Sequence, residues 1–228
     1  VLISGISFVG YVLFKLTSAK KGIQILSILG GLASSTALTL TFTNRSKETP
    51  ELSRSFAAGI ILGSTIMFPR ILLIVAVLNS ELALQLLIPF VVFTAAGIVT
   101  SFSLWKLAKK TYLKNVKLEN PFRVMFAVKF GIIFAAILFV TAAAKEYLGD
   151  QGVYLTSFLG GFANVDAVAL SMVDMSNDGI LIKVAAAAVV IGSLANTILK
   201  TIISAFFGAK ELRKFVLSGF GAILIVMA

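Results

Sequence analysis

The chain contains no cysteine and no histidine. This absence removes disulfides, the usual ligands of zinc, haem and iron–sulfur clusters, and a histidine general base. A bound metal ion would have to use oxygen ligands, which suit hard cations. Asp166 is the one acid in the interior of an apolar tract, away from its ends, so it is the candidate metal ligand. We expect no organic cofactor.

Charged residues are scarce at 13%, whereas 58% of the residues are hydrophobic. This composition, with a mean hydropathy of +1.01, excludes an ordinary soluble domain. Tracts of about 20 apolar residues are long enough to cross a bilayer as helices, and they lack the alternation of strands. We therefore predict an all-α integral membrane protein, a polytopic helical bundle in the lipid bilayer.

The charges that are present are mostly basic, with 20 Lys and Arg against 10 Asp and Glu. They lie in short loops between the apolar tracts, where such residues set the orientation of a membrane protein. Aromatic and basic residues do not interleave as they would on a nucleic-acid platform, so we expect no nucleic-acid partner.

One motif occurs twice, 130 positions apart. Residues 29–40 (LGGLASSTALTL) and 159–170 (LGGFANVDAVAL) share six identical residues. Duplicated apolar units with matching interruptions are typical of transporters and channels that bind their substrate between the repeats. We predict a first repeat at 1–105, a basic hinge at 106–120 and a second repeat at 121–228.

Eight apolar segments allow two ways of threading the membrane. The segments are 1–18, 22–44, 55–78, 82–105, 121–144, 152–175, 180–207 and 212–228. If both glycine–glycine segments enter and leave on one side, each repeat has three spanning helices and the second repeat is inverted. That threading puts 15 Lys and Arg on one face and 2 on the other, whereas eight plain crossings give 10 and 7. The bias favours the re-entrant threading, with hinge residues 106–123 on the cytoplasmic side of the inner (plasma) membrane.

The glycine pairs are the predicted helix breaks: Gly30, Gly31, Gly160 and Gly161. Residues that can cap a new helix follow them: Ser34, Ser35, Thr36, Asn164 and Asp166. Such side chains accept hydrogen bonds from the free N–H groups at a helix start, and that start favours an anion or carboxylate. The alternative is that the glycines only allow close packing of continuous helices.

Four ionisable residues lie inside apolar tracts: Arg70, Lys129, Asp166 and Lys200, the last one turn after Asn196. Ionisable groups at membrane depth are costly and normally face protein or water with a task. We take these residues, Asn196 and the capping residues as substrate-binding candidates. Three cations against one acid favour an anionic substrate. The alternatives are structural ion pairs, and a Lys129 side chain that reaches back to the basic surface.

Several of these motifs together resemble a known bacterial and archaeal family. The motifs are GGLASSTA (30–37), MFPR (67–70), NPF (120–122) with Lys129, VDAV (165–168) and ANT (195–197) with Lys200. The family is the membrane domain of unknown function often found C-terminal to an MgtC/SapB domain, and Pro69 is the one departure from its pattern. The chain also begins and ends inside apolar tracts, so we expect a piece of a longer protein. The resemblance implies that an MgtC/SapB-like domain precedes a truncated first repeat.

The leading functional hypothesis is a transporter or channel for a small ion or solute, leaning to anions and binding where the duplicated segments meet. The alternative is a non-transporting module that anchors or regulates an MgtC/SapB-like domain in magnesium or envelope homeostasis. A membrane enzyme acting on lipid phosphate is weaker, because no nucleophile, metal cluster or paired carboxylates accompany the cations. We therefore expect no enzyme activity, and a second copy of the chain is a further candidate partner.

Overall fold

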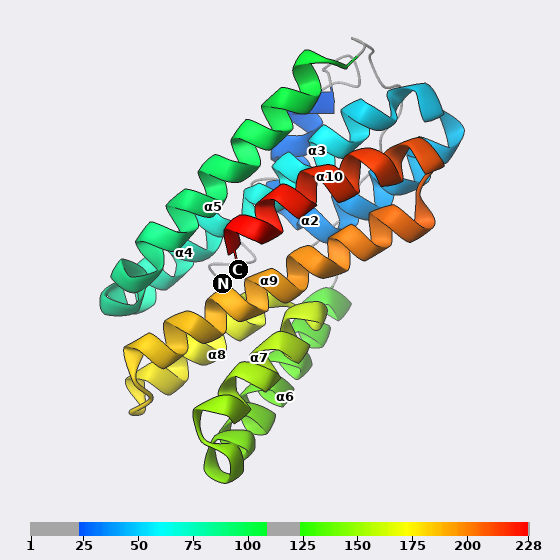
Figure 1. The fold of residues 1–228 in the computed structure, drawn as a ribbon. Coiled ribbons are helices and arrows are strands. Elements are labelled where there is room, and N and C mark those ends of the chain that lie inside the picture. The colour runs from blue at the N-terminus through cyan, green and yellow to red at the C-terminus, as the bar shows by residue number, and fades with distance from the viewer. Residues whose placement is uncertain (1–22, 109–123, 228) are drawn as a thin grey trace.

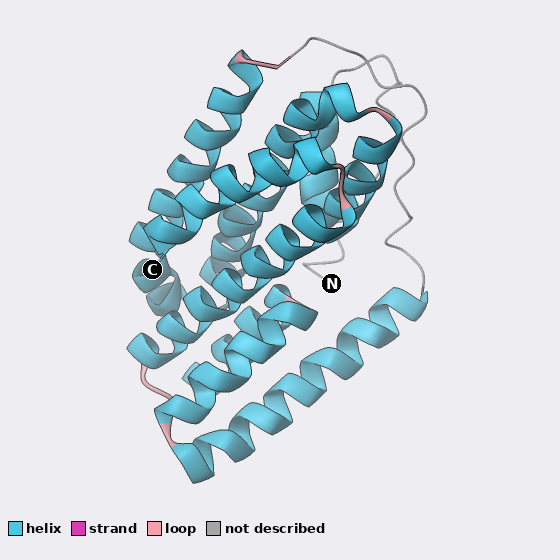
Figure 2. Cartoon of the chain, turned by 45° about the vertical axis from the view of Figure 1, so that its right-hand side comes forward, coloured by secondary structure: helices cyan, strands magenta, loops and turns pink. Residues whose placement is uncertain are grey.

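The computed structural model describes residues 23–108 and 124–227, and in these residues every element is helical, with no strand (Figures 1 and 2). The elements are α2 (Ile23–Glu48), the short 3₁₀ helix η1 (Pro50–Leu52), α3 (Ser53–Thr65), α4 (Met67–Leu78), α5 (Ser80–Lys106), α6 (Val124–Leu148), α7 (Asp150–Ala163), α8 (Val165–Asn177), α9 (Ile182–Phe207) and α10 (Lys210–Met227). The all-α prediction is confirmed. The predicted segment 1–18 and most of the hinge lie outside the described residues.

Four helical stretches are long and apolar enough to cross a membrane: Ile23–Glu48, Pro50–Leu78, Ser80–Lys106 and Ile182–Phe207. A bilayer core about 30 Å thick needs roughly 20 helical residues. Large apolar side chains such as Leu84, Ile88 and Val99 of α5 are exposed on the outside of the bundle. An apolar exterior around an apolar core supports the prediction of a membrane protein.

The helix α2 folds back on itself at Ser34, whose extended backbone (φ −167°, ψ 103°) interrupts the helix. A Cβ placed on Gly59 of α3 would lie 2.5 Å from Ser27 Oγ and 2.6 Å from Phe42 Cε2. On a straight helix Ser27 and Phe42 would be about 22 Å apart. The two arms of α2 therefore form a helical hairpin. The distance that α2 spans is shorter than that of a straight helix of 26 residues.

The helices α7 and α8 form a second hairpin of the same kind about Asn164, which is also extended (φ −165°, ψ 109°). Ser157 Oγ lies 4.0 Å from Met172 Sδ although the two residues are 15 positions apart. Figure 1 shows α8 returning along α7. Ser157, Asn164 and Met172 each lie 130 positions after Ser27, Ser34 and Phe42 of the first hairpin.

The breaks do not lie at the glycine pairs, as the sequence predicted, but three to four residues later. Extended backbone at Ser34 and Asn164 needs no glycine, because any residue adopts it. Gly31 and Gly161 lie within helices and let them pack closely. A Cβ on Gly31 would be 2.7 Å from Gly63 Cα, and one on Gly161 would be 2.3 Å from the Gly192 carbonyl oxygen. For the glycines themselves, the packing alternative is correct.

The predicted segment 55–78 is divided into α3 and α4 at Ile66. Pro69 has no N–H to donate to the carbonyl of Thr65, and its ring crowds the preceding turn, so the helix is interrupted there. The interruption places Arg70 in the first turn of α4. Phe68 anchors that turn against α5, with ring centroids 5.5 Å from both Phe90 and Phe93.

One end of the bundle, which we call the basic end, joins the C-terminus of α2 and the start of α3 to the turn between α9 and α10. Arg54 donates to the Leu107 carbonyl (2.9 Å) and lies 4.6 Å from the Phe215 ring centroid. The Ala209 N–H donates to Ser46 Oγ at 3.0 Å. The Lys and Arg side chains of this end are Arg45, Lys47, Arg54, Lys106, Lys210, Arg213 and Lys214.

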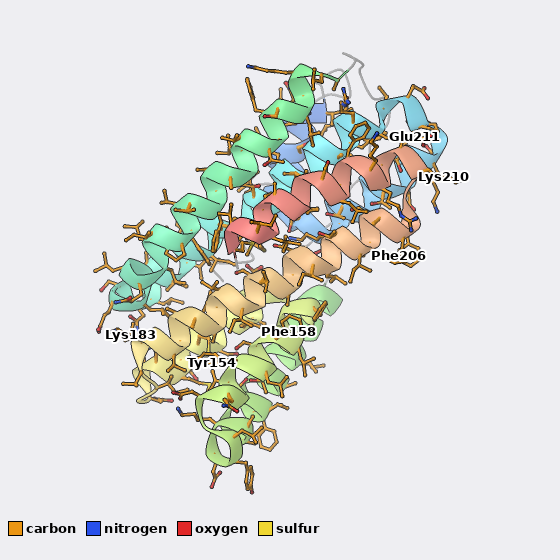
Figure 3. All side chains as sticks on the ribbon, viewed as in Figure 1. Tyr154, Phe158, Lys183, Phe206, Lys210 and Glu211 are labelled. Carbon is orange, nitrogen blue, oxygen red and sulfur yellow. The ribbon has the colours of Figure 1, made fainter. Side chains whose placement is uncertain are left out.

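The opposite end, which we call the acidic end, joins the α4–α5 turn to the end of α8. The Asn79 amide donates to Ser176 Oγ (3.1 Å) and Asn177 Oδ1 (2.9 Å). Figure 3 shows Lys183 at this end and Lys210 and Glu211 at the other. Its acids are Glu81, Glu146, Asp150, Asp174 and Asp178, of which Asp150 forms an ion pair with Lys145. These two groups of residues are the ones that the re-entrant threading assigns to opposite faces.

Candidate functional site

The Arg70 side chain joins the two helix breaks. Its Nη2 lies 3.0 Å from Asp166 Oδ1 and 2.7 Å from Asp166 Oδ2. Its Nη1 donates to the Leu32 carbonyl at 3.3 Å. Leu32 lies in the last turn of the first arm of α2, two residues before Ser34, and Asp166 lies in the first turn of α8. Both hairpin turns therefore lie within reach of one guanidinium, in a place where the two side chains are only 7% and 11% exposed.

Each break is capped by its own side chain. Ser34 Oγ accepts a hydrogen bond from the Ala37 N–H at 3.3 Å. Asn164 Oδ1 accepts from the N–H groups of Asp166 (3.0 Å) and Ala167 (3.4 Å). The first N–H groups of a helix have no partner within it, so these caps stabilise the helix starts where water is scarce. The sequence predicted both residues as capping candidates.

On the other side of each break, one carbonyl accepts a hydrogen bond from a side chain. The Asn196 amide on α9 donates to the Gly161 carbonyl near the end of α7 at 3.0 Å. Arg70 does the same for Leu32 at the end of the first arm of α2. Irregular backbone is tolerated at membrane depth only where protein or a wet cavity satisfies its polar groups. Asn196, a predicted substrate ligand, is here a structural partner of the second break.

Lys200 lies fully buried on α9, beside the Arg70–Asp166 ion pair. Its Nζ is 3.6 Å from Met67 Sδ, and it interacts electrostatically with both Arg70 and Asp166. Met67 is three residues before Arg70 and so lies on the same face of α4. A thioether is a weak acceptor, so the ammonium has little compensation within the described residues.

The other predicted site residues lie beside the first break or outside the description. Ser35 is buried and Thr36 half-buried, both in the first turn after Ser34. Lys129 belongs to α6, and its side chain lies outside the described residues. Of the four predicted in-membrane charges, three therefore gather at one place: Arg70, Asp166 and Lys200.

Sequence reasoning missed the contacts between the halves at each end of the bundle. Asn79 of the first half donates to Ser176 of the second. Ala209 lies 130 positions after Asn79, and Ser46 lies 130 positions before Ser176. These two residues are also in contact, since the Ala209 N–H donates to Ser46 Oγ. The 130-residue offset pairs Ser46 with Ser176 and Asn79 with Ala209 in an alignment of the two repeats. Such an alignment would not have shown that these residues are in contact across the halves.

The chemistry of this centre is that of two cations and one carboxylate beside two capped helix starts. Helix N-termini and buried cations both favour a negatively charged ligand. In the residues that the structure describes, no group of three or more Asp and Glu could hold a metal ion. The arrangement is therefore suited to an anion.

Comparison with known proteins gives a family match and one relative. The profile described as "Domain of unknown function (DUF4010)" matches residues 1–208. An uncharacterized protein of Aquifex aeolicus (strain VF5) is 29% identical over 190 residues, which cover 82% of this chain and 83% of the relative. No solved structure matches.

Proposed function

This chain belongs to the DUF4010 family, and we propose that it is a membrane transporter or channel for a small ion or solute, leaning to anions. The observation that carries this proposal is the Arg70 bridge between the Leu32 carbonyl and the Asp166 carboxylate. It joins two broken helices from different halves of the chain at a buried charged centre. Paired broken helices at a repeat interface form the substrate sites of many transporters.

The proposed architecture is a pair of inverted repeats, at 1–105 and 121–228, joined by the basic hinge. A two-fold axis makes contacts reciprocal, so that a contact from i to j is accompanied by one from j to i. The bonds Asn79–Ser176 and Ala209–Ser46 have this relation, and they lie at opposite ends of the bundle. An axis in the membrane plane exchanges the two ends, as an inverted repeat requires. The two hairpins would then be re-entrant segments entering from opposite sides.

We place the basic end on the cytoplasmic side of the plasma membrane, because Lys and Arg are enriched in the cytoplasmic loops of membrane proteins. Because the chain has no cysteine, single cysteines at Lys47, Asp150, Asp178 and Lys210 can be labelled from each side of an intact membrane. We expect Asp150→Cys and Asp178→Cys, which flank the second hairpin, to react from the outside. Lys47→Cys and Lys210→Cys should react from the inside. Labelling of positions 150 and 178 from opposite sides would rule out a re-entrant second hairpin.

The competing function is a non-transporting module that anchors or regulates an MgtC/SapB-like domain. Glycine–glycine segments that form continuous packed helices without a cavity would favour such a module. The breaks at Ser34 and Asn164, and the buried Lys200, weigh towards transport instead. The link to an MgtC/SapB domain stays a prediction from the sequence resemblance.

Ion flux into liposomes distinguishes a transporter or channel from a non-transporting module. The purified chain is reconstituted, and influx is followed for chloride, nitrate, formate, sodium and potassium. We expect anion flux above that of empty liposomes. Arg70→Gln should reduce it to background, since the guanidinium joins the two breaks. Arg45→Gln at the basic end is the matched control and should retain flux. A folded, reconstituted chain that moves none of these ions faster than Arg70→Gln would favour the non-transporting module.

A further inference from the structure

Among the side chains that the structure describes, the buried centre carries one uncompensated positive charge when Lys200 is protonated. Of the charged side chains that the structure describes, three are buried, namely Arg70, Asp166 and Lys200. Arg70 and Asp166 neutralise each other at 2.7 Å. Lys200 has no carboxylate within ion-pair distance in the described part of the chain, and its Nζ contacts Met67 Sδ. The excess positive charge therefore lies at Lys200.

Hydrogen-bond donors without partners lie at the same centre. An ammonium has three N–H donors, and a thioether accepts only weakly. The Arg70 Nε is buried and likewise has no partner among the described residues. Buried donors and charges are strongly unfavourable when they are left unpaired. Lys200 and Arg70 thus present donors that a negatively charged acceptor would satisfy.

We infer that this centre binds one small monovalent anion, a halide or a singly charged oxyanion, at Lys200. This inference deepens the proposed function and rests on it. One negative charge brings the sum over Arg70, Asp166, Lys200 and the ligand to zero. A divalent anion would leave an unpaired negative charge at membrane depth, which is costly. The capped starts of α8 and of the second arm of α2 add positive potential beside the site.

Binding is measured on the full chain in detergent, without any flux. The midpoint of thermal unfolding is followed against sodium chloride, nitrate and sulfate at matched ionic strength. We expect a saturable rise with chloride and nitrate, and none with sulfate. Lys200→Met should weaken nitrate binding by about tenfold or more, because removing one partner of a buried charge pair is that costly. Lys200→Arg should retain binding, as should Lys183→Met, the same change at an exposed position of α9.

A change in charge count should change the preferred anion. Asp166→Asn raises the charge of the centre by one, so sulfate should then stabilise the chain more than nitrate does. Equal stabilisation of the unaltered chain by sulfate and nitrate would overturn the inference, as would unchanged nitrate binding in Lys200→Met. If Asp166→Asn does not fold, nitrate binding by Lys200→Met and Lys200→Arg tests the inference. Selective nitrate binding without flux would refute transport alone, and flux without anion preference would refute the monovalent site alone.

Discussion

Asp166→Ala is expected to lower the free energy of unfolding by about 3–5 kcal/mol and to abolish transport. The change leaves the Arg70 guanidinium buried without its carboxylate, and an uncompensated buried charge is strongly destabilising. The Leu32 carbonyl would then be the one hydrogen-bond partner left to the Arg70 side chain among the described residues. Denaturant or thermal unfolding in detergent measures the loss.

A double replacement separates stability from function. Apolar side chains of similar volume often replace a buried ion pair without loss of stability. Arg70→Met with Asp166→Leu should therefore recover most of the stability that Asp166→Ala loses, while transport stays absent because the guanidinium that joins the two breaks is gone. Glu48→Ala at the exposed Arg45–Glu48 pair is the matched control, and it should cost no more than about 1 kcal/mol. A double variant that recovers transport would show that the pair is only structural.

Cross-linking the two halves at either end of the bundle is expected to stop transport completely. Asn79→Cys with Ser176→Cys joins the halves at the acidic end, and Ser46→Cys with Ala209→Cys joins them at the basic end. The links stand where a few hydrogen bonds join the halves, from Asn79 to Ser176 (3.1 Å) and Asn177 (2.9 Å), and from Ala209 to Ser46 (3.0 Å). Such bonds are worth only about 0.5–1.5 kcal/mol each, so they can open in turn as one repeat rocks against the other around the central site.

The measurement is liposome flux before and after a short bifunctional thiol reagent, with a cleavable link. Each double-cysteine variant should lose flux on cross-linking and regain it when the link is cleaved, whereas the four single-cysteine variants should not respond. Flux that persists with either link closed would mean that the halves do not move against each other. The protein would then conduct through a pore that stays in place.

The sequence predicts those features of the fold and of the candidate site that depend on neighbouring residues in the chain. Composition alone indicated a helical membrane protein, because any tract of that length and hydropathy favours the bilayer. The residue types that follow the two glycine pairs identified Ser34 and Asn164 among the capping candidates, because a cap needs only a side chain within three residues of the N–H it accepts from. The same local reasoning misplaced the breaks at the glycine pairs, since it could not distinguish a glycine that bends a chain from one that admits a neighbouring helix.

The pairing of charges was decided only by the tertiary structure. Arg70 meets Asp166 across 96 residues, and Lys200 meets Met67 across 133. No local pattern encodes these contacts, because they depend on how α4, α8 and α9 cross one another. The sequence by itself predicted three cations and one acid within apolar tracts and two matching interruptions. Packing decided that one guanidinium spans both interruptions and that Lys200 has no carboxylate partner among the described residues, because each side chain takes the partner that the helix crossings bring within reach.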